Sequence, residues 1–185
     1  MADLTDTLSI ENVVASTSID QEVDLAQLAI DFTASQYDPA HFPGLIYRLD
    51  DPAATAMMFR SGALICTGAT SKAAATTAIE RTLDELRALG IGVPDEPEIT
   101  IQNIVTVGDL GQELNLHALT IGFGLEHVEY EPEQFPGLVY RLDEPEVVVL
   151  LFGSGKIVIT GATQPADAER AIDRVHDDIE ALGLL

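Results

Sequence analysis

The side chains that most often catalyse reactions or bind metals are few in this chain and are not grouped. The four histidines, His41, His117, His127 and His176, share no metal-ligand spacing. Cys66 is the single cysteine and has no base beside it in the sequence, and no glycine loop opens a helix for phosphate. We therefore expect no enzyme, no metal centre and no internal disulfide.

The composition is that of a folded but strongly acidic protein. Among 185 residues, 31 Asp and Glu stand against 9 Lys and Arg, so the net charge is -22, while hydrophobic residues make up 46%. No apolar stretch reaches the ~18–20 residues that span a membrane, and the acidic N-terminus lacks the basic region of a signal peptide. We expect a soluble cytoplasmic protein.

Two explanations of the charge remain open at this point. An acidic surface normally argues against nucleic acid, because a polyanion is repelled. The alternative is adaptation to a salty cytoplasm, since at about 1 M salt the Debye length is only ~3 Å and like charges hardly interact. The positions of the acids must decide between them.

A long internal repeat divides the chain into two halves. Residues 42–70 align with residues 135–163 at an offset of 93, and sixteen of these twenty-nine positions are identical. Upstream, residues 12–14 match residues 103–105 at an offset of 91. The turn-rich connector at 92–97 is too short for independent domains. The predicted organisation is a first half at 1–93 and a second half at 98–185, which together form one continuous sheet.

Each half repeats the same order of expected elements. A strand comes first, then a short helix, three strands and a long helix, which predicts an α+β fold with an antiparallel sheet. Ser71 can cap the first long helix, and Pro165 opens the second, with apolar stripes that run to Leu89 and Leu182 before Gly90 and Gly183. The strands are expected at 10–18, 45–49, 55–59 and 64–67, and at 99–107, 138–142, 147–152 and 156–160; the short helices are expected at 25–32 and 116–123, and further short strands before Tyr37 and Tyr130.

The expected strands are apolar on both faces. Residues 147–152 contain no polar alternate, and residues 55–59 contain one Thr. An antiparallel strand with one wet face should alternate apolar with polar residues. Because four helices can cover only one face of such a sheet, the second face is expected to be an apolar interaction surface.

The acids avoid these strands. No Asp or Glu occurs between residues 12 and 19, 52 and 79, 99 and 108, or 147 and 166, whereas Arg48, Arg60, Arg141 and Lys156 fall in or beside the strands. A buried strand would also exclude acids, so this pattern alone leaves a plain core as an alternative. It nevertheless favours a surface that meets an anion.

The repeated motifs resemble those of the TATA-box-binding protein family, in its archaeal and halophilic form. They are Asn-(Val/Ile)-Val at 12–14 and 103–105, Phe-Pro-Gly-Leu-(Ile/Val)-Tyr-Arg-Leu-Asp at 42–50 and 135–143, and Phe-x-Ser-Gly followed by Thr-Gly-Ala at 59–69 and 152–162. The resemblance runs from about residue 10 to the end of the chain. It implies a pseudo-two-fold saddle: a curved antiparallel sheet of about ten strands, whose concave side meets the minor groove of DNA and whose convex side carries the helices.

The resemblance also implies roles for matching positions. In the family, two phenylalanines in each half wedge between base steps, and asparagine, threonine and apolar side chains contact base edges. The implied wedges are Phe42, Phe59, Phe135 and Phe152. The implied base contacts are Asn12, Asn103, Thr67, Thr160, Val14, Val105, Ile65, Val158, Met57 and Leu150.

The phosphate and partner contacts follow in the same way. The implied phosphate contacts are Arg48, Arg141, Ser61, Ser154 and Lys156, with Arg60 as a replacement for a lysine that is Ala63 in the first half. In the family, transcription factor B grips the second-half loop, which points here to Glu131 and Glu133, and it connects the complex to RNA polymerase.

Several further points stay open in the sequence. Cations between acids and phosphates are expected at the DNA interface, and no other cofactor is. The resemblance predicts a nucleoid-associated protein and leaves open a homodimer in the absence of DNA. The alternative function is a duplicated α+β module whose apolar face binds a partner protein or a small ligand.

Overall fold

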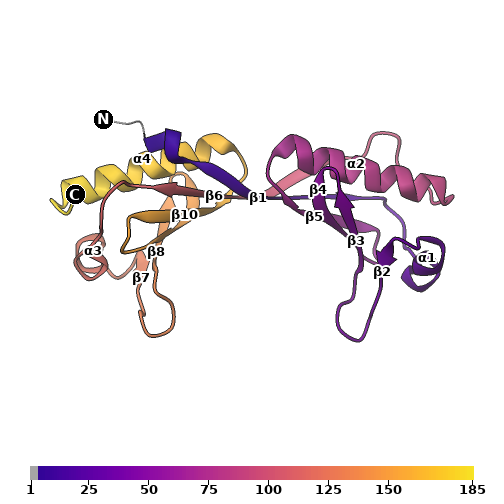
Figure 1. Cartoon of the computed structure of the whole chain (residues 1–185), viewed down its shortest axis with the longest axis horizontal. Coiled ribbons are helices and arrows are strands. Elements are labelled where there is room, and N and C mark those ends of the chain that lie inside the picture. Colours follow the sequence, from indigo (N-terminus) through magenta and orange to yellow (C-terminus); the bar gives the residue numbers. More distant parts are fainter. Residues whose placement is uncertain (1–3) are drawn as a thin grey trace. The chain divides into compact units, whose positions relative to one another are not determined.

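The computed structural model describes residues 4–185 and shows the repeated order of elements (Figure 1). The first half holds one short and one long helix and five strands of the sheet. Its elements are β1 (Ser9–Ser18), α1 (Leu25–Asp31), β2 (Ser35–Gln36), β3 (Leu45–Asp50), β4 (Ala53–Met58), β5 (Ala63–Ala69) and α2 (Lys72–Ala88).

The second half repeats this series. Its elements are β6 (Thr100–Asp109), α3 (Leu116–Phe123), β7 (Val128–Glu129), β8 (Leu138–Asp143), β9 (Glu146–Leu151), β10 (Lys156–Ala162) and α4 (Pro165–Ala181). The short strands expected before Tyr37 and Tyr130 are β2 and β7. A 3-10 turn at Leu4–Thr7 precedes β1 and was not predicted; it packs on α4, and the Thr7 hydroxyl accepts a hydrogen bond from the Asp109 amide at 3.0 Å.

The strands follow the order β2-β3-β4-β5-β1-β6-β10-β9-β8-β7 in a ten-stranded sheet. Within each half the neighbouring strands pair in the antiparallel sense, and the β4–β5 and β9–β10 hairpins turn at the pairs Ser61-Gly62 and Ser154-Gly155. Gly62 and Gly155 both have a φ of 88°, which suits glycine in these turns. The predicted α+β class with an antiparallel sheet of about ten strands is confirmed.

The long helices cover one face of the strands. α2 packs on β4 and β5, and α4 packs on β9 and β10. Burial alternates accordingly along β9, where Val147, Val149 and Leu151 are buried, while Val148 and Leu150 are only half-buried. The core therefore lies between one face of the strands and the helices, and the opposite face keeps apolar side chains that are partly open.

Local signals in the sequence explain the helix ends. The Ser71 side chain accepts a hydrogen bond from the Ala74 amide at 3.0 Å, as expected of an N-cap, and Pro165 is the first residue of α4. The apolar stripes are buried as predicted, except at their last positions. Leu89 and Leu182 follow the helices as C-caps and are exposed, because the chain turns away there at Gly90 and Gly183.

Two compact units share the chain. One is Asn12–Gln102, and the other joins Asn103–Leu185 with the segment up to Glu11. Each unit has its own helix-covered core. Within residues 4–185, none of the helices combines the length and apolar character that crossing a membrane requires.

Candidate nucleic-acid interface

The uncovered face of the first half is built from two rows of side chains across its strands. Arg48, Thr55 and Thr67 are cross-strand neighbours in one row. The next row contains Ile46, Met57, Ile65 and Ser16. Apart from the exposed Arg48, all of these side chains are half-buried. Their position opposite α2 leaves them available to a ligand.

The second half presents the same two rows. Arg141, Val148 and Thr160 form the first, and Val139, Leu150, Val158 and Val107 form the second. These residues are again half-buried, except for the exposed Arg141. Val14 and Val105 lie on the same uncovered face of β1 and β6, where buried and half-buried residues alternate. Every predicted apolar base contact is therefore on the uncovered face of its half.

The two asparagines are held in matched positions. Asn12 Oδ1 accepts from the Gly68 amide at 2.6 Å, and Asn103 Oδ1 accepts from the Gly161 amide at 2.7 Å. Each Nδ2 donates to a threonine hydroxyl, Thr67 or Thr160, at 3.1 Å. A backbone N–H can only donate, so the atom that faces it must be the amide oxygen. Each NH₂ group therefore has one further hydrogen to donate.

The four predicted wedge residues form two aromatic pairs. The ring centroids of Phe42 and Phe59 lie 5.8 Å apart at 65°, and those of Phe135 and Phe152 lie 5.9 Å apart at 71°. Three of the rings are half-buried, and Phe135 is 38% exposed. These are edge-to-face pairs of the kind that aromatic quadrupoles favour. None of the four side chains belongs to the buried core.

The glycine of each Phe-Pro-Gly motif makes room for its aromatic pair. A Cβ on Gly44 would lie 2.7 Å from Phe42 Cε1, and one on Gly137 would lie 2.7 Å from Phe135 Cε1. The expected strands 55–59 and 147–152 ended one residue too late, because Phe59 and Phe152 lie just beyond β4 and β9, which begin earlier, at Ala53 and Glu146. There the backbone amide and carbonyl of each Phe already belong to the hairpin turn.

The basic residues differ between the two faces. Four arginines on the helices form ion pairs with nearby acids: Arg81, Arg87, Arg170 and Arg174. Arg48, Arg60 and Lys156 make no ion pair with any residue in 4–185, and Arg141 is paired with Glu129. Cations without an acidic partner beside the strands are suited to an anionic ligand.

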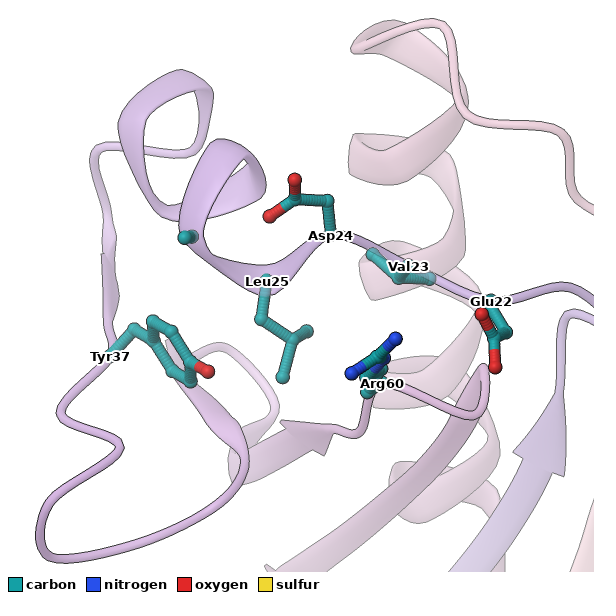
Figure 2. A pocket seen from close by; sticks show the side chains of 7 residues that line it. Glu22, Val23, Asp24, Leu25, Tyr37 and Arg60 are labelled. Atoms are coloured by element: carbon teal, nitrogen blue, oxygen red, sulfur yellow. The ribbon is translucent and has the colours of Figure 1, made fainter.

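Arg60 lies at an open pocket of about 520 Å³ rather than on the rows (Figure 2). In this view Tyr37 and Arg60 lie on opposite sides with Leu25 between them, and Glu22 lies beyond Arg60. The repeat-related pocket of the second half has Gly153 in place of Arg60. At this position of the repeat, in the β4–β5 turn, only the first half carries a cation.

The remaining predicted residues lie in turns and loops. Ser61 and Ser154 are exposed in the hairpin turns beside Phe59 and Phe152. Glu131 and Glu133 are exposed in the loop between β7 and β8, where the Glu131 carboxylate accepts from the Gln134 side chain. Lys156 shares an open pocket of about 580 Å³ with Phe152, Ser154 and Glu11, among others.

Some residues of the uncovered face were not predicted as contacts. Thr55, Ser16 and Ile46 complete the rows of the first half, as Val148, Val107 and Val139 do in the second. The signal that could have found them is the period of two along each strand, counted from the predicted contacts. Glu129 was missed as well, because its approach to Arg141 depends on the pairing of β7 with β8.

The fold and this face define a duplicated α+β protein with an open, acid-poor sheet surface suited to nucleic acid. The family model described as "Transcription factor TFIID (or TATA-binding protein, TBP)" matches residues 7–89 and 98–182. The chain belongs to this family.

Relatives of known name agree over the whole length. The chain is 58% identical to TATA-box-binding protein E of Halobacterium salinarum, with all of both chains covered. It is 59% identical to TATA-box-binding protein 1 of Haloferax volcanii, which covers 100% of this chain and 98% of the relative. Both relatives come from halophilic archaea. The solved structure of Methanococcus jannaschii TBP matches with a TM-score of 0.81 and 49% identity, over 95% of this chain and 99% of the other.

Proposed function

We propose that this protein is a general transcription initiation factor that binds TATA-box promoter DNA through the minor groove and bends it. The observation that carries the proposal is the uncovered face of each half, which has the asparagine and the apolar rows, with a phenylalanine pair outside the buried core at the end of its strands. The two halves act on the same duplex, one at each end of the site.

Base recognition follows from the hydrogen-bond donors and the apolar side chains of the uncovered face. In the minor groove, A·T and T·A pairs both show only acceptors, and a G·C pair adds the guanine amino donor. The free N–H of Asn12 or Asn103 suits an acceptor of adenine or thymine. Val14, Ile65 and their second-half counterparts Val105 and Val158, together with Met57 and Leu150, are apolar and offer no acceptor to the guanine amino group. The face therefore selects A/T-rich sequence but not its direction.

Bending follows from the phenylalanine pairs. Burying one Phe is worth roughly 1.5–3 kcal/mol, so a pair supplies about 3–6 kcal/mol. Unstacking a base step costs a few kcal/mol, a general value for proteins that kink the minor groove, of which this same family is a standard example. The two terms are of similar size. The phenylalanine pair of each half can therefore offset the free-energy cost of one kink in the DNA.

Phosphate contacts supply the sequence-independent part of binding. The cations that contact phosphate in this proposal are Arg48, Arg141, Lys156 and Arg60, and the neutral donors are the hydroxyls of Ser61 and Ser154. Four phosphate contacts correspond to a salt slope of about -3.6. The acids elsewhere on the protein repel DNA at low salt, and cations held between acids and phosphates reduce that repulsion.

The DNA-bound protein also recruits further factors. We propose that the loop with Glu131 and Glu133 receives transcription factor B, which fixes the orientation and brings RNA polymerase. The protein acts on chromosomal DNA, in the nucleoid. A homodimer that hides the uncovered face when DNA is absent is compatible with the same surface.

A binding and bending assay tests the proposal. The protein is titrated into a TATA duplex and a GC-only duplex of equal length, each with a donor and an acceptor dye at its ends. We expect binding and dye approach with the TATA duplex alone, and loss of the approach in Phe42→Ala/Phe59→Ala. Glu169→Gln on the outer face of α4 is the control. Binding to neither duplex would support the alternative of a module that binds a protein or a small ligand, and equal binding to both would contradict selection for the TATA sequence.

A further inference from the structure

The two halves hold their proposed phosphate-contacting arginines in different ways. Arg48 donates from Nη1 to the side-chain oxygen of Gln36 at 2.7 Å. Arg141 instead forms an ion pair with Glu129, with 3.4 Å between Nη2 and Oε1. Gln36 and Glu129 occupy the same position of the repeat, as the two arginines do. An exchange of amide for carboxylate therefore separates the direct partners of the two arginines.

The backbone around these pairs is the same in both halves. Gln36 of β2 lies opposite Ile46 of β3, and Glu129 of β7 lies opposite Val139 of β8. Arg48 lies two residues after Ile46, and Arg141 lies two residues after Val139. Each arginine is therefore the diagonal neighbour of Gln36 or Glu129 across an edge pair of strands. The halves therefore differ here in the charge of one side chain, and not in its placement.

Arg141 is an exception among the cations beside the strands. Arg48, Arg60 and Lys156 have no acidic partner in residues 4–185, whereas Arg141 has Glu129. The side chains of Arg141 and Glu129 are 56% and 69% exposed. Both therefore lie where a DNA phosphate could reach them, and the carboxylate already occupies the guanidinium that the phosphate would need.

We infer that Glu129 competes with the DNA backbone for Arg141, so that the second half grips phosphate less readily than the first. The inference rests on the proposed function, which it deepens. A phosphate that binds Arg141 must displace a carboxylate and then lie near it, whereas a phosphate that binds Arg48 displaces a neutral amide. The two halves of a near-symmetric surface therefore hold the DNA backbone unequally.

The competition depends on salt. An exposed ion pair is weak and is screened further as ionic strength rises. The repulsion between the Glu129 carboxylate and an incoming phosphate is screened in the same way. The weaker phosphate binding of the second half is therefore most pronounced at low salt and disappears toward molar salt.

Reciprocal exchange of the two side chains provides the test. The full chain is compared with Glu129→Gln, Gln36→Glu and Glu169→Gln, the last of which changes the net charge as Glu129→Gln does but lies on the outer face of α4. Each protein is titrated into one TATA duplex at about 0.1 M salt and at about 1 M and above. At low salt we expect Glu129→Gln to bind roughly two- to fivefold tighter than Glu169→Gln, and Gln36→Glu to bind weaker than the unchanged chain by a similar factor. The differences should vanish at molar salt.

Two results separate the inference from the proposed function. If the unchanged chain prefers TATA to GC-only DNA but Glu129→Gln binds no tighter than Glu169→Gln, the inference is wrong and the proposed function stands. If the unchanged chain shows no such preference, the proposed function itself fails. Thermal unfolding verifies the fold of each variant, and Glu129→Gln decides alone should Gln36→Glu not fold.

Discussion

At the scale of single residues, the matched asparagines carry the most specific part of the account. Asn12 is fixed by the Gly68 amide and by Thr67, and Asn103 is fixed by Gly161 and Thr160. Each side-chain amide is therefore already oriented before it meets the minor groove of the DNA, and little side-chain entropy is lost when it binds.

Asn12→Asp isolates the donor from the scaffold. The carboxylate still accepts from the Gly68 amide and the Thr67 hydroxyl, so the Tm should stay close to that of the unchanged chain. The donor to the base is lost and a charge is added. A side-chain contact with a base is worth ~1–3 kcal/mol, so we expect the affinity for the TATA duplex to fall by about tenfold or more. Fluorescence titration measures the affinity. An unchanged affinity would remove Asn12 from the interface.

Thr106 offers a test on the opposite face. Its side chain is 2% exposed, and its hydroxyl is one of two buried side-chain groups in residues 4–185 without a hydrogen-bond partner. Thr106→Val replaces it with a methyl group of the same shape and removes a desolvation cost of about 1–3 kcal/mol. We expect a higher Tm and the same DNA affinity, by calorimetry and titration. A lower Tm would mean that the hydroxyl is satisfied in solution.

At the scale of elements, the second half ties its long helix to its sheet with a polar contact. The Tyr140 hydroxyl of β8 donates to Asp178 of α4 at 3.0 Å, and Arg174 Nε lies 3.0 Å from both carboxylate oxygens. Phe123 of α3 stacks on the Tyr140 ring at 4.3 Å. Burial, followed by the Asp178 hydrogen bond, raises the pKa of Tyr140 to about 12.

This pKa predicts the behaviour of the protein in alkali. A phenol with a pKa raised in the fold binds its proton more tightly there than in the unfolded chain, where the pKa is about 10. Its contribution to stability is complete below pH 10 and is lost as the pH rises from 10 to 12, by at most ~2–3 kcal/mol. Tyr140→Phe should flatten this part of the stability curve, measured by denaturant unfolding. An unchanged curve would mean that Tyr140 does not titrate in this range.

Most of the elements could be predicted because their signals are local. Helix caps such as Ser71 can be recognised within a few residues, and the repeat shows which segments of the two halves share a structure. The uncovered face was predictable because Val147–Leu151 is apolar at every position while only one side can meet a helix. The 3-10 turn at Leu4–Thr7 and the pair of Arg141 with Glu129 were not, since they depend on which segments pack together. The exposure of Leu89 and Leu182 depends on where the chain leaves each helix.

At the scale of the whole molecule, charge is distributed by face and not evenly. The net charge of -22 comes with a sheet face that has Arg and Lys but few acids, while the helix arginines are already paired with acids. Relatives with the same length come from halophilic archaea. An acidic protein that binds DNA is consistent with an environment in which salt screens the repulsion between them.

Salt should therefore affect this protein in an unusual direction. Counterion release alone weakens binding as salt rises, with a slope of about -3.6 for four phosphate contacts. Repulsion from the remaining acids exceeds this term at low salt, so we expect TATA affinity to increase as KCl rises toward molar concentrations. A titration series in KCl measures the slope. Affinity that is highest at low salt and falls steadily would contradict the halophilic interpretation.

The central claim, that the uncovered face reads the minor groove, is tested most directly by changing one groove at a time. Inosine lacks the amino group of guanine, so an I·C pair resembles A·T in the minor groove and G·C in the major groove. Affinity is measured at high salt for a TATA duplex and for two copies in which every A·T pair is replaced, by I·C in one and by G·C in the other. The account predicts that the I·C duplex binds nearly as well as TATA and that the G·C duplex does not. Loss of binding to the I·C duplex would contradict it.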